Sequence, residues 1–258
     1  MPPDSAAPNE RGWQPGWALF LDVDGTLLEL AETPQGVHVS ASLKQLLDDV
    51  RQRLDGALAL VSGRSLANLD QLFSPLRLIA SGVHGCERRA ADGIVLRPEI
   101  DAAMIARVRS DLAEFARGHE GLLLEDKHYA LALHYRRAPH LEEEVYRVME
   151  QMRVYLGPTF ALQAGKSVVE LRPSGWTKGT SIESFMKEAP FAGRTPVFLG
   201  DDVTDEDAFA VVNAMNGISV KVGPAKVATL AHHRLGGVSD VLRWLYTVPP
   251  IVFPQPTT

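Results

Sequence analysis

The chain has 258 residues, 45% of them hydrophobic, which is enough apolar material for the core of one large or two modest globular domains. Its formal net charge is −6 at pH 7, and it has no run of lysine and arginine, which argues against nucleic acid or an anionic membrane surface as a partner. No stretch approaches the roughly 20 apolar residues that span a bilayer.

The two ends of the chain differ from the rest in composition. Residues 1–17 are rich in proline, alanine and polar side chains, and they lack the basic start and apolar centre of an export signal. The only cysteine, Cys86, cannot form an internal disulfide or a thiolate metal site. We therefore expect a cytoplasmic protein with flexible tails at 1–17 and 249–258.

Short apolar runs, typical of strands covered on both faces, alternate with amphipathic helical patterns along most of the chain. The expected strands are Ala18–Asp22, Gly56–Ser62, Leu76–Ala80, Pro196–Gly200 and Gly217–Val222. The expected helices are Ser40–Leu54, Ser65–Phe73, Lys178–Lys187, Asp205–Met215 and Val238–Tyr246. This alternation predicts an α/β domain, formed by residues 18–98 and 173–248, in which helices cover a parallel sheet.

Between residues 99 and 172 the pattern changes to helix, two strands, helix, two strands. The expected helices are Ile100–Gly118 and His140–Leu156, and the expected strands are Leu122–Lys127, Tyr129–Arg136, Phe160–Gln163 and Ser167–Arg172. Alternation along these strands separates an apolar face from a charged one. We predict an inserted α+β unit, an antiparallel sheet with two helices on its apolar face, whose charged face can close over a ligand held by the larger domain.

Two aspartates, Asp22 and Asp24, stand where the first expected strand gives way to a glycine turn. Because successive strand side chains alternate, both carboxyls fall on one side and can share a cation and a phosphate. One carboxylate can then attack phosphorus, while the other exchanges a proton with the leaving oxygen and with water. An acidic turn that merely closes a buried strand would have the same sequence. A phosphoryl-transfer site therefore requires further polar residues elsewhere in the chain.

A second carboxylate cluster, Asp201, Asp202 and Asp205, follows the expected strand at 196–200. In open parallel sheets ligands lie beyond the carboxyl ends of the strands, so this cluster is expected to meet the first pair of aspartates. An oxygen-rich set without histidine or thiolate suits Mg2+. For Asp205, capping of the helix that follows is an equally good interpretation.

Two further polar positions lie where a phosphoryl group would need donors. Ser62, in Val61-Ser-Gly-Arg64, ends the second expected strand, and its hydroxyl and the amides beside it can donate to phosphate oxygens. Lys178 begins an expected helix and can place an ammonium beside the phosphate. A serine turn and a solvated helical lysine are the simpler interpretations of each position alone, but the four elements occur together and in order.

Asp22-Val-Asp-Gly-Thr26, Ser62-Gly-Arg64, Lys178 and Gly200–Asp205 resemble the four ordered motifs of haloacid-dehalogenase-type phosphatases. The resemblance covers the whole larger domain and implies a Rossmann-like core with an inserted cap of the C2 type. It implies that Asp22 is the nucleophile and Asp24 the acid/base, and that Ser62 and Lys178 hold the phosphate. The Mg2+ ligands that it implies are Asp22, the backbone carbonyl of Asp24 and Asp201. Asp202 and Asp205 are further candidate ligands from the acidic cluster, either directly or through water.

Within that superfamily the chain resembles the trehalose-6-phosphate phosphatases, through Gly82–Glu87, Glu125-Asp-Lys127, His134-Tyr-Arg136, Gly165-Lys166, Glu170–Pro173 and Thr204-Asp-Glu206. The resemblance implies Mg2+-dependent hydrolysis of trehalose 6-phosphate and a functional coupling to a trehalose-6-phosphate synthase. It implies substrate contacts from both units, at Asp22, Val23, Asp24, Thr26, Ser62, Gly63, Arg64, His84, Glu125, Lys127, Arg136, Lys166, Glu170 and Lys178.

Other interpretations fit the same residues. The charged cap positions also suit a solvated surface, since charged side chains are usually exposed. The core motifs do not separate trehalose 6-phosphate from sucrose phosphate or a mannosyl phosphate as substrate, and a phosphosugar mutase would share them. A non-catalytic sugar-phosphate sensor or a regulatory subunit is the alternative from a different class, and Mg2+-dependent phosphate release separates either from an enzyme.

Overall fold

The computed structural model describes residues 14, 16–30, 38–224 and 227–247. The tail predicted at 249–258 and most of the one predicted at 1–17 lie outside these residues. Trp17, assigned to that tail from its composition, instead begins the first strand, is buried, and stacks on Trp244 with ring centroids 6.4 Å apart. In the described residues no helix combines the length and the apolar character needed to cross a membrane.

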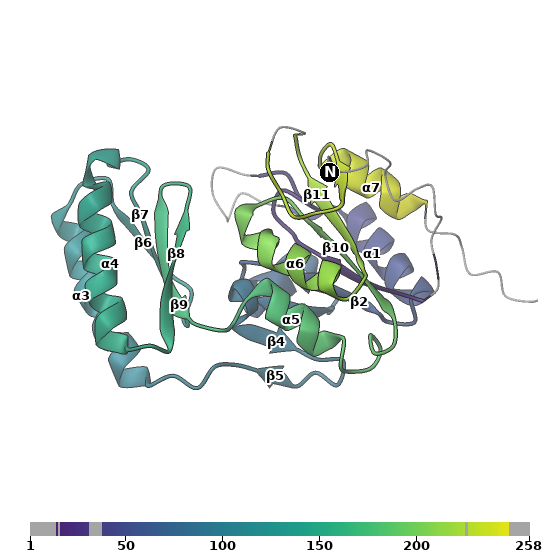
Figure 1. Ribbon diagram of the computed structural model, residues 1–258, viewed down its shortest axis with the longest axis horizontal. Helices are drawn as coiled ribbons and strands as arrows, with labels where there is room; N and C mark the ends of the chain where they lie inside the picture. Colours follow the sequence, from purple (N-terminus) through teal and green to yellow (C-terminus); the bar gives the residue numbers. More distant parts are fainter. Residues whose placement is uncertain (1–13, 15, 31–37, 225–226, 248–258) are drawn as a thin grey trace, which may run out of the picture.

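The larger unit is built on one eight-stranded sheet (Figure 1). Its strands, in spatial order, are β12 (His233–Leu235), β11 (Ile218–Val222), β10 (Thr195–Gly200), β1 (Trp17–Leu21), β2 (Leu58–Val61), β3 (Ile79–Gly82), β4 (Glu87–Arg89) and β5 (Val95–Leu96). All neighbours from β12 to β3 are parallel, as predicted for the five expected strands, to which the structure adds β12. The order places β1 in the middle, and all five of its residues are buried.

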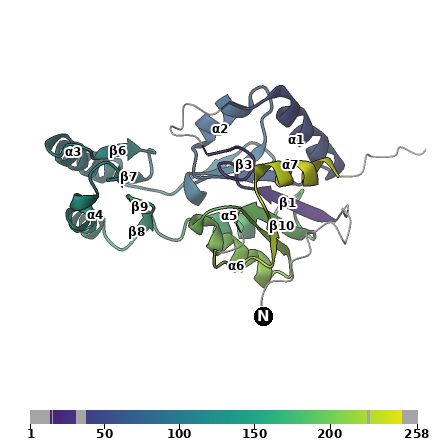
Figure 2. The same cartoon turned by 90° about the horizontal axis from the view of Figure 1, so that it is seen from above.

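Helices cover both faces of this sheet. They are α1 (Ala41–Arg53), α2 (Leu66–Phe73), α5 (Lys178–Phe185), α6 (Glu206–Ala214) and α7 (Val238–Tyr246). Figure 2 shows α1 and α2 on one side of the sheet and α5 and α6 on the other. Phe20 of β1 packs against Phe185 and Phe191, with ring centroids 6.0 and 5.2 Å away, so the middle of the sheet is fixed in an apolar core.

At one edge the parallel sheet continues into two strands that were not predicted, β4 and β5, which are antiparallel to their neighbours. Sequence analysis missed β4 because its three residues, Glu87, Arg88 and Arg89, are all charged. They are nevertheless buried. Each has a partner: Arg88 pairs with Glu188 through two bonds of 2.9 Å, Arg89 with Asp70 through two of 2.7 Å, and Glu87 accepts the Leu66 amide at 2.7 Å. Buried charges persist when they are paired in this way.

The smaller unit, called the cap below, corresponds to the predicted insertion, and its last strand in the chain ends at Pro173, one residue beyond the predicted boundary. Its antiparallel sheet has the order β6 (Leu123–Asp126), β7 (Leu131–His134), β9 (Val168–Pro173) and β8 (Phe160–Gly165). Two helices, α3 (Ala102–Gly118) and α4 (Glu142–Leu156), cover one face (Figure 1). Leu131, Leu133, Val169 and Leu171 are buried beneath them, as the alternation predicted.

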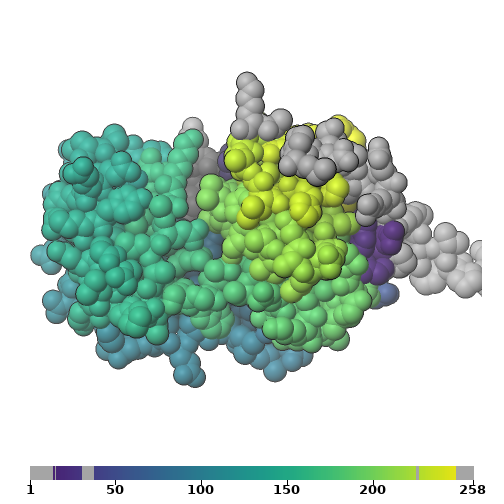
Figure 3. Space-filling view, in the orientation of Figure 1, coloured from purple at the N-terminus to yellow at the C-terminus, as the bar shows by residue number. Residues whose placement is uncertain are grey.

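The opposite face of the cap sheet is polar and belongs to the side nearer the larger unit. Registered pairs place Glu125, Ala132, Glu170 and Gln163 in one row across the four strands. In the space-filling view the cap and the larger unit touch along part of their boundary, and the surface is hollowed between them (Figure 3). The α/β core with a separate α+β cap is the predicted fold class, which the structure confirms.

Candidate active site

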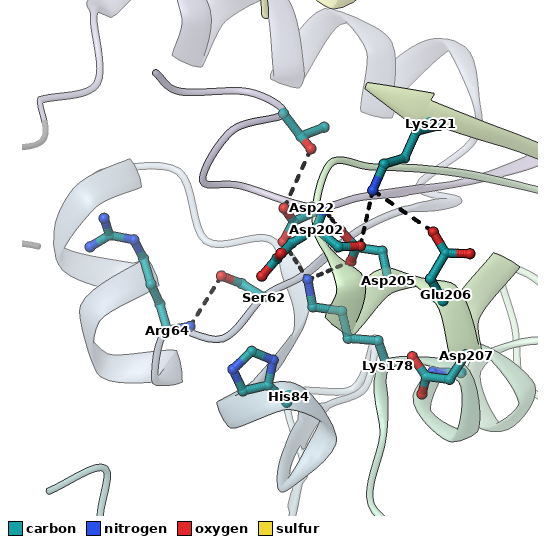
Figure 4. Close-up of polar contacts among 12 residues, drawn as sticks. Asp22, Ser62, Arg64, His84, Lys178, Asp202, Asp205, Glu206, Asp207 and Lys221 are labelled. Carbon is teal, nitrogen blue, oxygen red and sulfur yellow. Dashed lines mark hydrogen bonds and ion pairs between the residues drawn. The ribbon is translucent and has the colours of Figure 1, made fainter. Parts of the chain in front are cut away.

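The carboxyl ends of three neighbouring strands bring distant polar residues together (Figure 4). Asp22 directly follows β1, Ser62 follows β2 and Asp201 follows β10. Because Leu21 is paired in register with Leu60 and Leu199, these three side chains start at nearly the same level of the sheet. The convergence expected from parallel topology is therefore present.

Three of the predicted acidic residues form one cluster. Asp22, Asp201 and Asp205 each offer a carboxylate oxygen, and these oxygens lie within 4.8 Å of one another. Asp22 and Asp205 are buried. Gly25, at φ +82°, makes the close approach possible, since a Cβ there would collide with the Asp201 carboxylate.

Lys178 connects two members of the cluster. Its Nζ donates to Asp22 Oδ1 at 2.7 Å and to Asp205 Oδ1 at 2.6 Å. The residue begins α5, which is preceded by a capping box between Thr177 and Thr180. With a side chain only 3% exposed, the ammonium is fixed beside both carboxylates and directed into the site.

The charges of the cluster are not balanced. Burial raises the pKa of Asp22 well above its ordinary value, and the carboxylates of Asp205 and Asp201 add to this rise, while Lys178 opposes it. Burial and the neighbouring Asp205 raise the pKa of Asp201 to about 6. Burial alone would lower the pKa of Lys178, but Asp205 and Asp22 raise it above the ordinary value, so the lysine stays charged.

A divalent cation fits this set of donors. Asp201 Oδ1 is buried and has no hydrogen-bond partner among the described residues, although buried carboxylate oxygens are normally satisfied. The cluster offers oxygen ligands only, as Mg2+ prefers. A bound cation would also relieve the mutual repulsion that raises the carboxyl pKa values.

The other two predicted metal ligands lie outside the three-residue cluster. Asp24 is half-buried, and its carboxylate forms two bonds with Arg64, Oδ2 to Nε at 2.7 Å and Oδ1 to Nη2 at 2.6 Å. Asp202 is exposed and is the N-cap residue of the short 3-10 helix Val203–Asp205. Alternation accounts for Asp202, which follows Asp201 directly and points to the other side. The Asp24 carboxylate was expected on the same side as Asp22 and is instead bound by Arg64.

Asp205, for which ligand and helix cap were equal interpretations, makes no side-chain capping bond to α6. Its Oδ2 instead accepts the amide of Asp202 at 2.9 Å, and its Oδ1 pairs with Lys178. This side chain therefore links the acidic turn to the lysine. Asp205 is thus a member of the acidic cluster, and its bond to the Asp202 amide also stabilises the turn.

The predicted phosphate contacts lie on the same side of the site. Ser62 is buried, and its Oγ accepts the Arg64 amide at 3.1 Å. Thr26 is buried as well and lies 3.4 Å from Asp22 Oδ2 through its Oγ1. Val23 belongs to the apolar core, so only its backbone can serve the site.

Residues of the cap approach the core at His84. Lys127 Nζ donates to Glu170 Oε2 at 3.1 Å, and His84 Nε2, from the larger unit, lies 3.8 Å from the same oxygen. Glu170 Oε1 and His84 Nδ1 are buried without a hydrogen-bond partner in the described part of the chain. Two unsatisfied polar atoms at a domain boundary are typical of a place where a polar ligand binds.

The His84 ring is held in a neutral state and packs against Gly63. A Cβ at Gly63 would lie 2.6 Å from the ring atoms Cε1 and Nε2. Burial lowers the pKa of His84 well below its ordinary value, and the cations Lys127, Lys178 and Arg172 add to this effect. A neutral imidazole offers one donor and one acceptor, which suits a hydroxyl group.

The remaining predicted cap contacts are less enclosed. Glu125 accepts a hydrogen bond from His134 Nε2 at 2.9 Å, which lowers the pKa of Glu125, whereas Arg136 and Lys166 are exposed. Sequence analysis did not assign His134 to the site. It also missed Lys221, which the structure places beside the acidic turn. A lysine flanked by Val220 and Val222 in the expected strand at 217–222 was the available signal.

Comparison with known proteins agrees with this geometry. Residues 20–236 match the family model described as trehalose-phosphatase. The chain belongs to the trehalose-phosphatase family. It is 46% identical to a probable trehalose-phosphate phosphatase of Sinorhizobium fredii over 83% of this chain and 81% of that protein. It is also 46% identical to the trehalose-6-phosphate phosphatase of Escherichia coli, over 89% of this chain and 85% of the relative.

Solved structures share the fold at lower sequence identity. The C-terminal domain of C. albicans trehalose-6-phosphate phosphatase superposes with a TM-score of 0.76 at 24% identity, covering 90% of this chain and 92% of that one. A phosphatase of the haloalkanoate superfamily from Bacteroides thetaiotaomicron gives 0.63 at 19% identity, covering 89% and 95%. These neighbours share the fold of this chain, including its core and cap.

Proposed function

We propose that the protein hydrolyses trehalose 6-phosphate to trehalose and phosphate through an aspartyl-phosphate on Asp22. The observation that carries the proposal is the meeting of Asp22, Asp201, Asp205 and Lys178 at the strand ends. Family membership supports the substrate, because relatives at 46% identity bear the name trehalose-phosphate or trehalose-6-phosphate phosphatase. A synthase that forms trehalose 6-phosphate would supply the substrate and couple the two activities.

In the first step Asp22 attacks phosphorus, and the bond from phosphorus to the sugar oxygen breaks. Asp24 gives a proton to that oxygen, so trehalose leaves as a neutral alcohol. The bonds to Arg64 hold the Asp24 carboxylate beside the site, and they must loosen for Asp24 to carry this proton. Lys178 and Ser62 donate to the phosphoryl oxygens and hold the group in line.

In the second step a water oxygen attacks phosphorus, and the bond from phosphorus to Asp22 breaks. Asp24 takes the proton of that water and so returns to its first protonation state. Mg2+, when held by Asp22, Asp201 and the turn that contains Asp205, would neutralise the negative charge that develops on the phosphoryl oxygens. Attack of the water oxygen on phosphorus releases inorganic phosphate and regenerates Asp22 as a free carboxylate.

The polar row of the cap supports a neutral disaccharide as the leaving group. Glu125 and Glu170 lie in this row with Ala132 between them, and the small side chain of Ala132 leaves space over the sheet. Trehalose offers hydroxyl groups and no charge, so paired acceptors and donors such as Glu170 and Lys127 suit it. Neutral His84 adds a contact from the core side.

Phosphate release from trehalose 6-phosphate, sucrose 6-phosphate and glucose 6-phosphate, each with Mg2+ and with EDTA, tests the proposal. We expect release to require Mg2+ and kcat/KM to be highest for trehalose 6-phosphate. A higher kcat/KM for sucrose 6-phosphate would overturn the substrate assignment, and release of equal rate in EDTA would overturn the role of the acidic cluster. Binding without any release would indicate a sensor.

A further inference from the structure

A lysine is buried at the carboxyl end of β11, next to the acidic turn. Lys221 is paired in register with Gly200, the residue that precedes Asp201, and its side chain is only 4% exposed. Lysine is almost never fully buried unless its charge is paired, because removal from water is costly. Its partners therefore indicate what the position serves.

The Lys221 ammonium is directed at the turn (Figure 4). Its Nζ donates to the backbone carbonyl of Asp202 at 3.2 Å and lies 3.8 Å from Glu206 Oε1. The Phe209 ring of α6 lies beneath it, with the centroid 5.9 Å away. The ammonium is thus enclosed by a carbonyl, a carboxylate and an aromatic face, all from residues 202 to 209.

Glu206 is itself fixed, so the pair is not a loose surface contact. Its Oε1 accepts the Thr229 hydroxyl at 2.8 Å, and its Oε2 accepts the Leu230 amide at 2.7 Å. The carboxylate therefore connects Lys221 to a segment that follows β11. Such a network restricts the position of the ammonium to a small volume.

Both backbone groups of Asp202 are consequently held. Its amide donates to Asp205 Oδ2 at 2.9 Å, and its carbonyl accepts from Lys221 Nζ and from the Asp205 amide, each at 3.2 Å. Asp202 stands between Asp201 and Asp205, the two members of the acidic cluster on this turn. A change in the backbone torsion angles of Asp202 would move the carboxylates of Asp201 and Asp205 relative to Asp22.

We propose that Lys221 is a positioning residue for cation binding, which fixes the Asp202 carbonyl and so presents Asp201 and Asp205 at the spacing that a divalent ion requires. The inference rests on the proposed use of a divalent cation by this cluster. Groups that orient metal ligands without touching the metal typically contribute a factor of about 10 to 100 in metal affinity. Lys221 supplies such a contact through the main chain.

The test is the affinity of the substrate-free protein for Mn2+, followed by electron paramagnetic resonance of the unbound ion. Lys221→Met keeps an unbranched apolar side chain and removes the donors, and we expect the Kd for Mn2+ to rise about tenfold or more. Lys221→Gln is a second variant in case the first does not fold, since its amide falls about one bond length short of the carbonyl. Lys187→Met, the same change at an exposed lysine of the larger unit, should leave the Kd unchanged.

Two further measurements separate positioning from general stability. In EDTA the melting temperature reports the structural cost of each variant, and a purely structural role would lower it without changing the Kd of the folded fraction. At saturating Mg2+ the kcat of a positioning variant should recover toward the parent value, while more Mg2+ is needed for half-maximal rate. Parental Mn2+ affinity in a folded Lys221→Met or Lys221→Gln protein overturns the inference. If the parent itself binds no Mn2+, the proposed cation site fails instead.

Discussion

Lys178 and Asp22 are 156 positions apart in the sequence, yet the Nζ of Lys178 lies 2.7 Å from Asp22 Oδ1. Both side chains are almost completely buried. The contact joins the start of α5 to the end of β1, so it exists only when the sheet and helix layers have assembled. The positive charge beside the proposed nucleophile is therefore present only in the folded protein.

Loss of the ammonium should be costly for the protein without metal. Lys178→Met leaves Asp22 and Asp205 without their common cation, and removing one partner of a buried pair costs about 3–5 kcal/mol. We expect the free energy of unfolding in urea to fall by about that amount in EDTA and by less at saturating Mg2+, because the ion supplies positive charge. An unchanged free energy in EDTA would contradict the proposed role of the pair, with Lys187→Met as the control.

The contribution of Asp201 to the stability of the metal-free protein should decrease as pH rises from about 4 to about 6. The pKa of Asp201 is raised from 3.8 to about 6, so the folded state binds more protons than the unfolded state in this window. Stability from this group is therefore complete below the unfolded pKa and is lost as pH passes through the folded pKa. The expected loss is on the order of 1 kcal/mol.

Melting temperatures between pH 4 and pH 7 in EDTA measure this effect, and Asp201→Asn is the matched variant that cannot titrate. The fall in melting temperature with rising pH should be smaller in Asp201→Asn than in the parent. Mg2+ should flatten the parent curve between pH 4 and pH 6, because the cation favours the ionised carboxylate and so lowers the pKa of Asp201 in the folded state. Parallel curves for the two proteins would show that Asp201 is not the group responsible.

The Asp22 carboxylate should be required for turnover but not for folding. Asp22→Asn keeps the size of the side chain and removes one charge from a crowded cluster, so stability in EDTA should equal or exceed that of the parent. The kcat should fall by about 10^4-fold or more, as expected for loss of a nucleophile. Phosphate release measures the first effect and thermal unfolding the second. Normal turnover would eliminate the aspartyl-phosphate mechanism.

How far the sequence predicts this structure differs between elements. The strands β1 and β10 were predictable because both are apolar runs bounded by glycine or aspartate turns. In contrast, β4 was not, since Arg88 is buried only because Glu188, 100 positions later, lies opposite it. The sequence around Arg88 does not indicate an ion-pair partner 100 positions later.

The candidate site likewise has parts that the sequence predicts and parts that it does not. Convergence of Asp22 and Asp201 follows from parallel topology alone, which could be inferred from the alternation of strands and helices. The outward direction of Asp202 and the pairing of Asp24 with Arg64 depend on the exact course of two turns. Lys221 was missed for a related reason, because a lysine in a strand is explained only by the carbonyl and carboxylate that receive it.

The polar face of the cap should control the choice of leaving group without taking part in the chemistry at phosphorus. Glu170 lies in the centre of that face, bound to Lys127 and 3.8 Å from His84, whereas the acidic cluster belongs to the larger unit. Hydrogen bonds to charged groups contribute about 1.5–3 kcal/mol, and tenfold in kcat/KM corresponds to about 1.4 kcal/mol. Glu170→Ala should therefore lower kcat/KM for trehalose 6-phosphate by about 10- to 100-fold.

For a small aryl phosphate, which has no sugar hydroxyls to bind, the same variant should keep kcat/KM within about threefold of the parent, since its loss would come only from indirect effects. Glu125→Ala should behave alike, because Glu125 lies in the same row of the sheet. Glu143→Ala, an exposed glutamate on α4, is the matched control and should change neither substrate. Equal losses for both substrates in Glu170→Ala would mean that this side chain supports the phosphate site, and the cap would then lose its proposed role in recognising the disaccharide.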